Sequence, residues 1–243
     1  MQGEERMTAS GSAFAPLGMV AAFRWEVSAL LRRQPDVSRL GNHRFRFGLK
    51  GTPVVLAIAG AGAKNAHRAA CDLNRNFSVA GLISIGFAGG LRESVGAGEL
   101  VLAEEVIEEA TGEHFPCQPG LLPIDSGIEG SLLCAAAVVN SATEKRALER
   151  RWGALAVDME SGGVARASKE MGLPFAALKS ITDVSDRSIA IDFQRCQSDD
   201  GGLSSWKIVR EGMASPRGIR DLWRLAGSSR RAAGRLALAL CSV

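Results

Sequence analysis

The spacing of hydrophobic positions changes repeatedly along the chain. Residues 17–22 form a short apolar run, which is followed by Trp25, Val27, Leu30 and Leu31 at helical spacing. An unbroken apolar run is typical of a buried strand, and apolar residues three and four positions apart are typical of one helix face. This stretch is therefore predicted to be a strand that leads into a helix.

The same change of period recurs as far as residue 181. It predicts strands at 52–59, 81–86, 99–107, 154–157 and 174–181, an alternating strand at 43–47, and helices at 64–77, 143–152 and from Glu160. Strands that alternate with helices favour a parallel or mixed sheet covered on both faces. We expect a single α/β domain over residues 15–243, with three αβα layers around a mixed central sheet, and a loose leader at 1–14.

Polar or glycine-rich segments follow four of these strands. They are Arg24 with Glu26, residues 87–90, residues 158–160 and residues 182–186. Ligands of open α/β sheets bind beyond the carboxyl ends of the strands. The four segments are therefore the candidate functional site.

Composition and charge narrow the class of protein. The 243 residues are 46% hydrophobic and 23% charged, which fits a globular domain. The net charge of +3 is uneven, because residues 206–243 carry 8 basic and 2 acidic side chains and residues 1–205 carry 21 and 24. The longest uncharged run, 7–23, is too short and too polar to span a membrane.

Five scattered cysteines without a CxxC pair favour a reduced cytoplasmic setting without a structural metal.

Three motifs at the strand ends carry a family resemblance. They are Gly-Phe-Ala-Gly-Gly-Leu at 86–91, Val-Asp-Met-Glu-Ser at 157–161 and Ser-Ile-Thr-Asp at 180–183. Together with the loop at 21–27, they resemble the nucleoside phosphorylase and nucleosidase superfamily, whose members cleave the bond between a base and ribose. The resemblance spans residues 17–187.

The resemblance assigns the leaving base and the sugar to different residues. It implies that Asp183 is the general acid at the purine N7 and that Thr182 orients its carboxylate. Glu160 would accept hydrogen bonds from the ribose hydroxyls, and Met159 would pack on the sugar. Protonation of the base and a carboxylate near the cationic sugar both stabilise the transition state of this reaction.

Four further positions complete the predicted binding site. The backbone N–H groups of Ala88 and Gly89 would approach the base or the nucleophile, beside Phe87. Lys179 shares strand parity with Asp183, so its side chain is expected on the same face, where it would orient that carboxylate.

The first loop bears on the choice of nucleophile. Its match to the nucleosidase form makes Glu26 the base that activates water, whereas Arg24 would hold phosphate in a phosphorylase. A second arginine is lacking at the glycine-rich strand, where Phe87 stands, so hydrolysis is favoured. No cofactor is expected, and phosphate would be the co-substrate of a phosphorylase.

The segment from Val138 onward points to a subfamily. It replaces the usual adenine-recognising segment of methylthioadenosine/adenosylhomocysteine nucleosidases and resembles that of hopanoid-associated phosphorylases, which are taken to release adenine from adenosylhopane. The resemblance therefore implies an adenine nucleoside with a bulky 5′ substituent. A methylthioadenosine/adenosylhomocysteine nucleosidase, a purine nucleoside phosphorylase and a nucleoside-binding protein without catalysis are the alternatives.

The basic C-terminus is predicted to form a helix at about 215–240. Ile219, Leu222, Trp223 and Ala226 share one face, among arginines on the others. A helix docked on the body with a solvated basic face, or a peripheral membrane contact, both fit this pattern.

The superfamily implies a homo-oligomer, dimer or trimer. Nucleic acid is not an expected partner, because the basic residues are not interleaved with aromatics.

Overall fold

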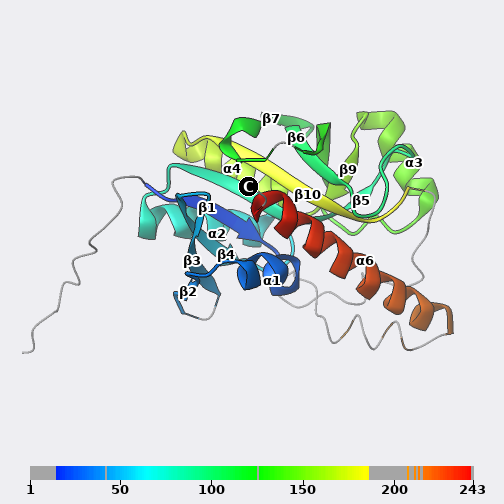
Figure 1. Cartoon of the computed structure of the whole chain (residues 1–243). Coiled ribbons are helices and arrows are strands. Elements are labelled where there is room, and N and C mark those ends of the chain that lie inside the picture. The colour runs from blue at the N-terminus through cyan, green and yellow to red at the C-terminus, as the bar shows by residue number, and fades with distance from the viewer. Residues whose placement is uncertain are drawn as a thin grey trace, which may run out of the picture.

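The protein is a mixed α/β domain in which one sheet holds every described strand (Figure 1). The computed structural model describes residues 15–185, except 42 and 125, three isolated residues (207, 211 and 213), and a C-terminal helix whose side chains are described at 224 and 226–241. The strands are β1 (Leu17–Ala21), β2 (Ser38–Arg39), β3 (Arg44–Leu49), β4 (Thr52–Ile58), β5 (Gly81–Gly90), β6 (Leu100–Glu108), β7 (Glu113–Pro116), β8 (Ile128–Cys134), β9 (Ala156–Asp158) and β10 (Phe175–Asp183).

Helices cover both faces of the sheet. They are α1 (Arg24–Arg33), α2 (Ala63–Phe77), α3 (Ala142–Trp152), α4 (Ser161–Met171) and α6 (Pro216–Cys241), with a short 3-10 turn, η1 (Pro119–Leu121). One buried cluster lies between the sheet and the pair α2 and α4. A second lies between the sheet and the pair α1 and α6, which pack side by side in Figure 1. The predicted α/β fold with a mixed sheet and helices on both faces is confirmed.

The central strands bring the predicted site segments together. Strand β5 pairs in parallel with β1 and β10 and antiparallel with the short β9. The carboxyl ends of parallel neighbours meet at one edge of a sheet, so the segments after β1, β5 and β10 converge there. Strand β9 ends at Asp158 beside them.

Part of the sheet closes on itself, which the sequence pattern does not predict. Strand β10 pairs with both β5 and β6, and the path from β6 through β8 and β9 returns to β5. The periodicity also misses β7 and β8. Strand β8 contains Glu129 and Gly130 within its first half, which interrupts the apolar run that marks the other buried strands.

Helices α2 and α4 approach each other closely at Gly163. A Cβ atom at this position would lie 2.0 Å from the backbone oxygen of Ala63. Only glycine allows this contact, which holds the first turns of both helices next to the site edge of the sheet.

The second half of α6 is docked on the body. Leu236, Ala237 and Leu240 are buried against the α1 side of the sheet, and the arginines at 224, 230, 231 and 235 are exposed. Of the four residues predicted to form its apolar face, Ala226 is exposed, and the side chains of Ile219, Leu222 and Trp223 lie outside the described part of the helix. Asp186 and the predicted leader at 1–14 also lie outside the described residues. Within the described part of the chain, no helix has the length and apolarity needed to cross a bilayer.

Candidate functional site

A cavity of about 210 Å³ opens at the carboxyl ends of the central strands. It gathers residues that are far apart in the sequence, from the loop after β1, the end of β5, the segment before α3, the β9–α4 junction, the end of β10 and helix α6. The lining residues are Ala22, Phe23, Trp25, Glu26, Ala61, Phe87, Ala88, Gly89, Ala137, Val138, Val139, Val157, Asp158, Met159, Glu160, Thr182, Asp183 and Ser229.

Glu26 presents a buried carboxylate on one wall of this cavity. The backbone N–H of Phe23 donates to its Oε2 at 2.8 Å, and that of Phe87 donates to its Oε1 at 3.1 Å. Burial raises the pKa of Glu26, although nearby Lys179 and the backbone N–H groups act in the opposite direction. A raised pKa brings a carboxylate toward the range in which a general base works near neutral pH.

Gly86 is required for this placement of Glu26. Its φ is +152°, and a Cβ atom there would lie 2.8 Å from the Glu26 Oε1. The glycine that opens the predicted strand-end motif therefore makes room for a carboxylate 60 positions earlier in the chain.

Asp183 lies at the end of β10 and contacts three residues. Thr182 donates its hydroxyl to Oδ1 at 3.1 Å, and Gly89 approaches so closely that a Cβ there would be 3.3 Å from Oδ2. Lys145 of α3 forms an ion pair with Oδ2, and its ammonium also donates to the backbone oxygen of Val184 at 2.9 Å. Lys145 is fully buried.

Lys145 is a residue that the sequence does not single out. It stands in a run of charged residues on a predicted surface helix, where a lysine is ordinarily solvated. Its burial follows from the packing of α3 beside the end of β10, a contact between segments 38 residues apart.

Glu160 lies at the start of α4 and is buried with a like charge nearby. The backbone N–H of Gly62 donates to its Oε1 at 2.7 Å. Burial, with the neighbouring Asp158, raises the pKa of Glu160 to about 7, against the opposing effect of Lys179. This residue is therefore partly protonated at neutral pH when no ligand is bound.

Lys179 does not contact Asp183, contrary to the expectation from strand parity. Its ammonium pairs with Asp158 at 2.8 Å, and both side chains are almost completely buried. The register of β10 against β5 shifts between Ile181 and Asp183. An extra residue in one strand reverses the direction of the side chains that follow, which explains why the parity argument fails. Burial alone would lower the pKa of Lys179, but Asp158 and Glu160 raise it.

Arg24 does not line the cavity. It is exposed, and its guanidinium lies 5.4 Å from the centre of the Phe45 ring. The part of the cavity that the structure describes is lined by four acidic residues, Glu26, Asp158, Glu160 and Asp183, and by no lysine or arginine, although the carboxylate of Asp158 is itself buried against Lys179. The predicted phosphate contact of Arg24 gains no support from this arrangement.

Comparison with known proteins decides the family. The model of the Phosphorylase superfamily matches residues 16–125 and 122–199, which is most of the chain. The chain belongs to the Phosphorylase superfamily. The superfamily predicted from the strand-end motifs is therefore confirmed.

The curated relatives of this superfamily member include several nucleosidases. The chain is 27% identical over 198 residues to the 5′-methylthioadenosine/S-adenosylhomocysteine nucleosidase of Baumannia cicadellinicola, which covers 70% of this chain and 86% of that protein. It is 23% identical over 221 residues to the enzyme of the same name from Oceanobacillus iheyensis, at 79% and 96% coverage.

Solved structures share the fold of the superfamily. The nucleosidase of the same name from Helicobacter pylori with butyl-thio-DADMe-Immucillin-A has a TM-score of 0.67 at 17% identity, covering 93% of this chain and 97% of that one. Native futalosine hydrolase from Helicobacter pylori has a TM-score of 0.66 at 17% identity, covering 91% and 95%.

Within this superfamily fold, the structure brings together eight of the ten predicted site residues. They are Glu26, Phe87, Ala88, Gly89, Met159, Glu160, Thr182 and Asp183. Lys179 lies behind the lining and Arg24 faces outward. The cavity also includes an apolar wall that the predicted residues do not contain, made of Ala22, Phe23, Trp25, Ala61, Ala137, Val138, Val139 and Val157.

Proposed function

We propose that this protein hydrolyses the N-ribosyl bond of an adenine nucleoside and releases adenine. The observation that carries the proposal is the lining of the cavity, which includes the acidic residues Glu26, Glu160 and Asp183 and no described lysine or arginine. Phosphate is ordinarily held by arginine or lysine side chains, and the described lining offers neither, so we favour water as the nucleophile.

Glu26 is proposed as the base that activates water. Two backbone N–H groups fix its carboxylate at the cavity wall, and its raised pKa suits proton abstraction near neutral pH. Water transfers a proton to Glu26 and its oxygen bonds to the anomeric carbon, while the bond from that carbon to the base breaks.

Asp183 is proposed to donate a proton to N7 of the leaving base. The donation removes negative charge from adenine and leaves it on Asp183, beside the ammonium of Lys145. The ion pair would stabilise the carboxylate that remains, and the Thr182 hydroxyl would keep its plane oriented. The step balances when Asp183 enters it as the neutral acid and Glu26 as the carboxylate, because Glu26 then gains one proton and Asp183 gives one.

Glu160 is proposed to bind the ribose hydroxyls and to stabilise the cationic sugar. Its pKa of about 7 reflects burial and Asp158, so a positive charge that develops at the sugar favours its ionised form. This interaction is stronger in the transition state than with the neutral nucleoside, which raises the rate and not only the affinity.

The apolar wall supports a substrate with an apolar 5′ substituent. Phe23 and Trp25 stack with ring centroids 4.2 Å apart, and Trp25 is 44% exposed beside the cavity. An adenosine that carries a hydrocarbon at its 5′ position, such as adenosylhopane, would place that group against these rings. The names of the relatives make 5′-methylthioadenosine and S-adenosylhomocysteine the alternative substrates.

Adenine release tests the activity and its nucleophile. The protein is incubated with 5′-substituted adenosines with and without phosphate, and free adenine is measured. Equal release without phosphate is expected, with loss of at least about a hundredfold in kcat for Asp183→Asn and Glu26→Gln. The exposed Glu129→Gln is the matched control. Release only with phosphate would establish a phosphorylase, and binding without turnover a nucleoside-binding protein.

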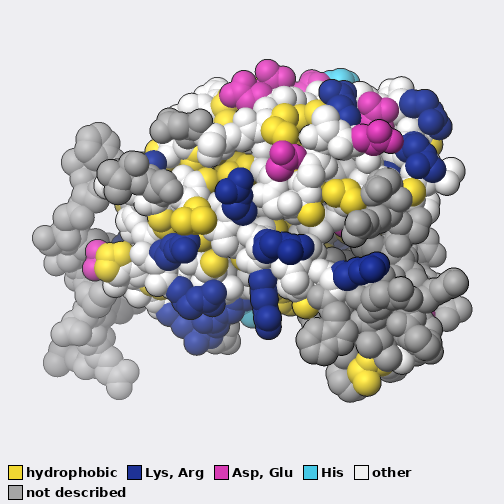
Figure 2. All heavy atoms as spheres, turned by 45° about the vertical axis from the view of Figure 1, so that its right-hand side comes forward, with side chains coloured by type: hydrophobic (Ala, Val, Ile, Leu, Met, Phe, Trp, Pro, Cys, Tyr) yellow, Lys and Arg dark blue, Asp and Glu magenta, His cyan; other side chains and the backbone are white. Residues whose placement is uncertain are grey.

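A peripheral membrane contact through α6 is also proposed. Arginines 224, 230, 231 and 235 are exposed on this helix, and Ser229 of the same helix lines the cavity. Figure 2 shows lysine and arginine side chains over the middle and lower part of one face and also at its upper right, where acidic side chains lie beside them. Sedimentation with anionic vesicles should fall for the double variant R230Q/R231Q. Sedimentation equal to wild type would refute the contact.

The homo-oligomer, dimer or trimer, stays a prediction.

A further inference from the structure

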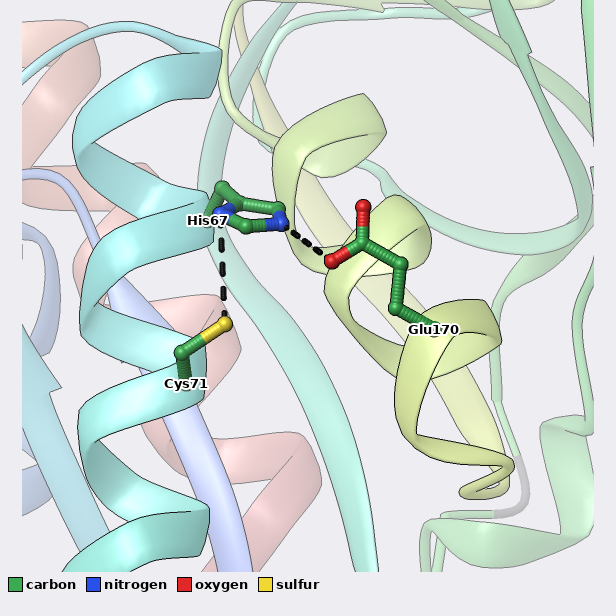
Figure 3. Close-up of side chains that lie close together, drawn as sticks. All are labelled: His67, Cys71 and Glu170. Carbon is green, nitrogen blue, oxygen red and sulfur yellow. Dashed lines mark hydrogen bonds and ion pairs between the residues drawn. The ribbon is translucent and has the colours of Figure 1, made fainter.

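A second group of polar side chains lies away from the cavity, between α2 and α4. His67 and Cys71 are one helical turn apart on α2, and Glu170 faces them from α4 (Figure 3). The Nε2 of His67 lies 2.8 Å from the Glu170 carboxylate, and its Nδ1 lies 3.9 Å from the Cys71 sulfur. Within the described residues, this is the group of histidine, cysteine and acid that is compact enough to share a metal ion.

The two contacts of His67 fix its tautomer in a form that suits a metal. When the carboxylate of Glu170 accepts the Nε2 proton, the lone pair of Nδ1 is left facing Cys71. Histidines that bind metals almost always donate their other ring N–H to a carboxylate or carbonyl in this way. Glu170 is therefore placed to orient the imidazole ring of His67 and not to bind the ion itself.

The spacing of the two donors fits one tetrahedral ion. Zinc lies about 2.3 Å from sulfur and about 2.0 Å from imidazole nitrogen, which at a tetrahedral angle separates the two donors by about 3.6 Å. The observed separation of 3.9 Å requires only a small rotation of the Cys71 side chain. His67 is about one-third exposed, so water can reach the remaining coordination positions.

We propose that His67 and Cys71, oriented by Glu170, bind a thiophilic divalent ion of the Zn²⁺ class. Sulfur and imidazole are the ligands that such ions prefer over Mg²⁺ or Ca²⁺. A Cys–His–Glu nucleophile is the other chemistry of this trio. Cys71 does not line the described cavity, so a substrate bound there would not meet this thiol.

The ion would bind between the two helices whose first turns position Glu160 in the candidate active site. Helix α2 begins at the residues that hold Glu160 through the Gly62 N–H, and α4 begins directly after Glu160. Because the Cys71–His67 chelate is tied to α4 by Glu170, binding stabilises the packing of the two helices. At a hundredfold excess over Kd, one site of this kind should raise the Tm by about 5–10 °C.

Titration with Co²⁺ tests the site in the full-length, reduced and tag-free protein. A near-ultraviolet thiolate-to-cobalt absorption band is expected, and Zn²⁺ should abolish it by displacement. The band should disappear in C71S and in H67Q, and E170Q should keep it with affinity about 10–100-fold lower. Cys241→Ser is the matched control, because Cys241 is also half-buried and on a helix.

Several results would overturn the assignment. They are the absence of a band in wild type, a band of undiminished intensity in C71S or H67Q, or an affinity unchanged in E170Q. Because H67Q removes the other donor, it tests the site independently if C71S does not fold. Adenine release is not a readout of this experiment, so its outcome is separate from that of the proposed activity.

Discussion

Replacement of Glu160 by glutamine should stabilise the protein at high pH and abolish its activity. The glutamine has the same shape, and its amide oxygen can still accept the 2.7 Å hydrogen bond from the Gly62 N–H. What it removes is a carboxyl group whose pKa is raised from 4.5 to about 7 by burial and by Asp158. The buried negative charge that would stabilise the cationic sugar therefore lowers the free energy of unfolding of the protein.

The magnitude follows from the shift in pKa. A group whose folded-state pKa is raised gives its full stabilisation below the unfolded pKa, here near 4.5, and loses it as pH rises through about 7. A difference of about 2.5 pKa units corresponds to about 3–4 kcal/mol at 1.4 kcal/mol per unit. Wild type should therefore lose about this much relative to Glu160→Gln between pH 4.5 and pH 8.

Urea unfolding of both proteins at several pH values measures this difference. The free energy of unfolding of the variant minus that of wild type should increase from pH 5 to pH 8, with little change in the m-value. The exposed Glu129→Gln should show no such trend. A difference that stays constant with pH would show that Glu160 does not carry a raised pKa, and the account of its charge would be wrong.

Four other changes test the described contacts. Lys179→Met should destabilise the protein by about 3–5 kcal/mol in urea unfolding at neutral pH, because it leaves a buried carboxylate unpaired. Gly86→Ala should displace the carboxylate of Glu26 and lower kcat for adenine release about a hundredfold, a result that unchanged kinetics would contradict. Gly163→Ala should cost about 1–3 kcal/mol through its clash between α2 and α4. Gly234→Ala on α6, where a Cβ meets nothing within 4 Å, should instead stabilise by about 0.5–1 kcal/mol; thermal unfolding compares the two.

The sequence predicts the strands and the residues at their ends, because both depend on local patterns. Apolar runs mark β1, β4, β5 and β10, and parallel pairing brings their ends to one edge whatever the loops between them do. For that reason Glu26 and Asp183 are found together, whereas Glu160 joins them because the short β9 pairs antiparallel with the end of β5. The sequence does not reveal the closure of the sheet through β6, since strand pairing between distant segments leaves no periodic signal.

The lysines of the site show where local reasoning stops. Parity along β10 places Lys179 with Asp183, but the register shift after Ile181 turns Asp183 to the other face, and Lys179 pairs with Asp158 instead. Lys145 has the surroundings of a solvated residue in sequence, and only the packing of α3 buries it against Asp183. The wrong prediction for Lys179 and the omission of Lys145 both come from long-range geometry. The cause is a bulge in β10 for Lys179 and the position of α3 for Lys145.

The position of these two lysines, more than their presence, supports the proposal that water is the nucleophile. Each forms an ion pair with one cavity carboxylate from behind, so that the fold tolerates four acids in one place. Neither ammonium lines the cavity, so the described lining offers no cation to a bound phosphate. A phosphorylase needs its cations on the other side of that boundary, in contact with phosphate. With the cations behind the carboxylates, the same charges favour a cationic sugar and an uncharged water, which is the arrangement that hydrolysis requires.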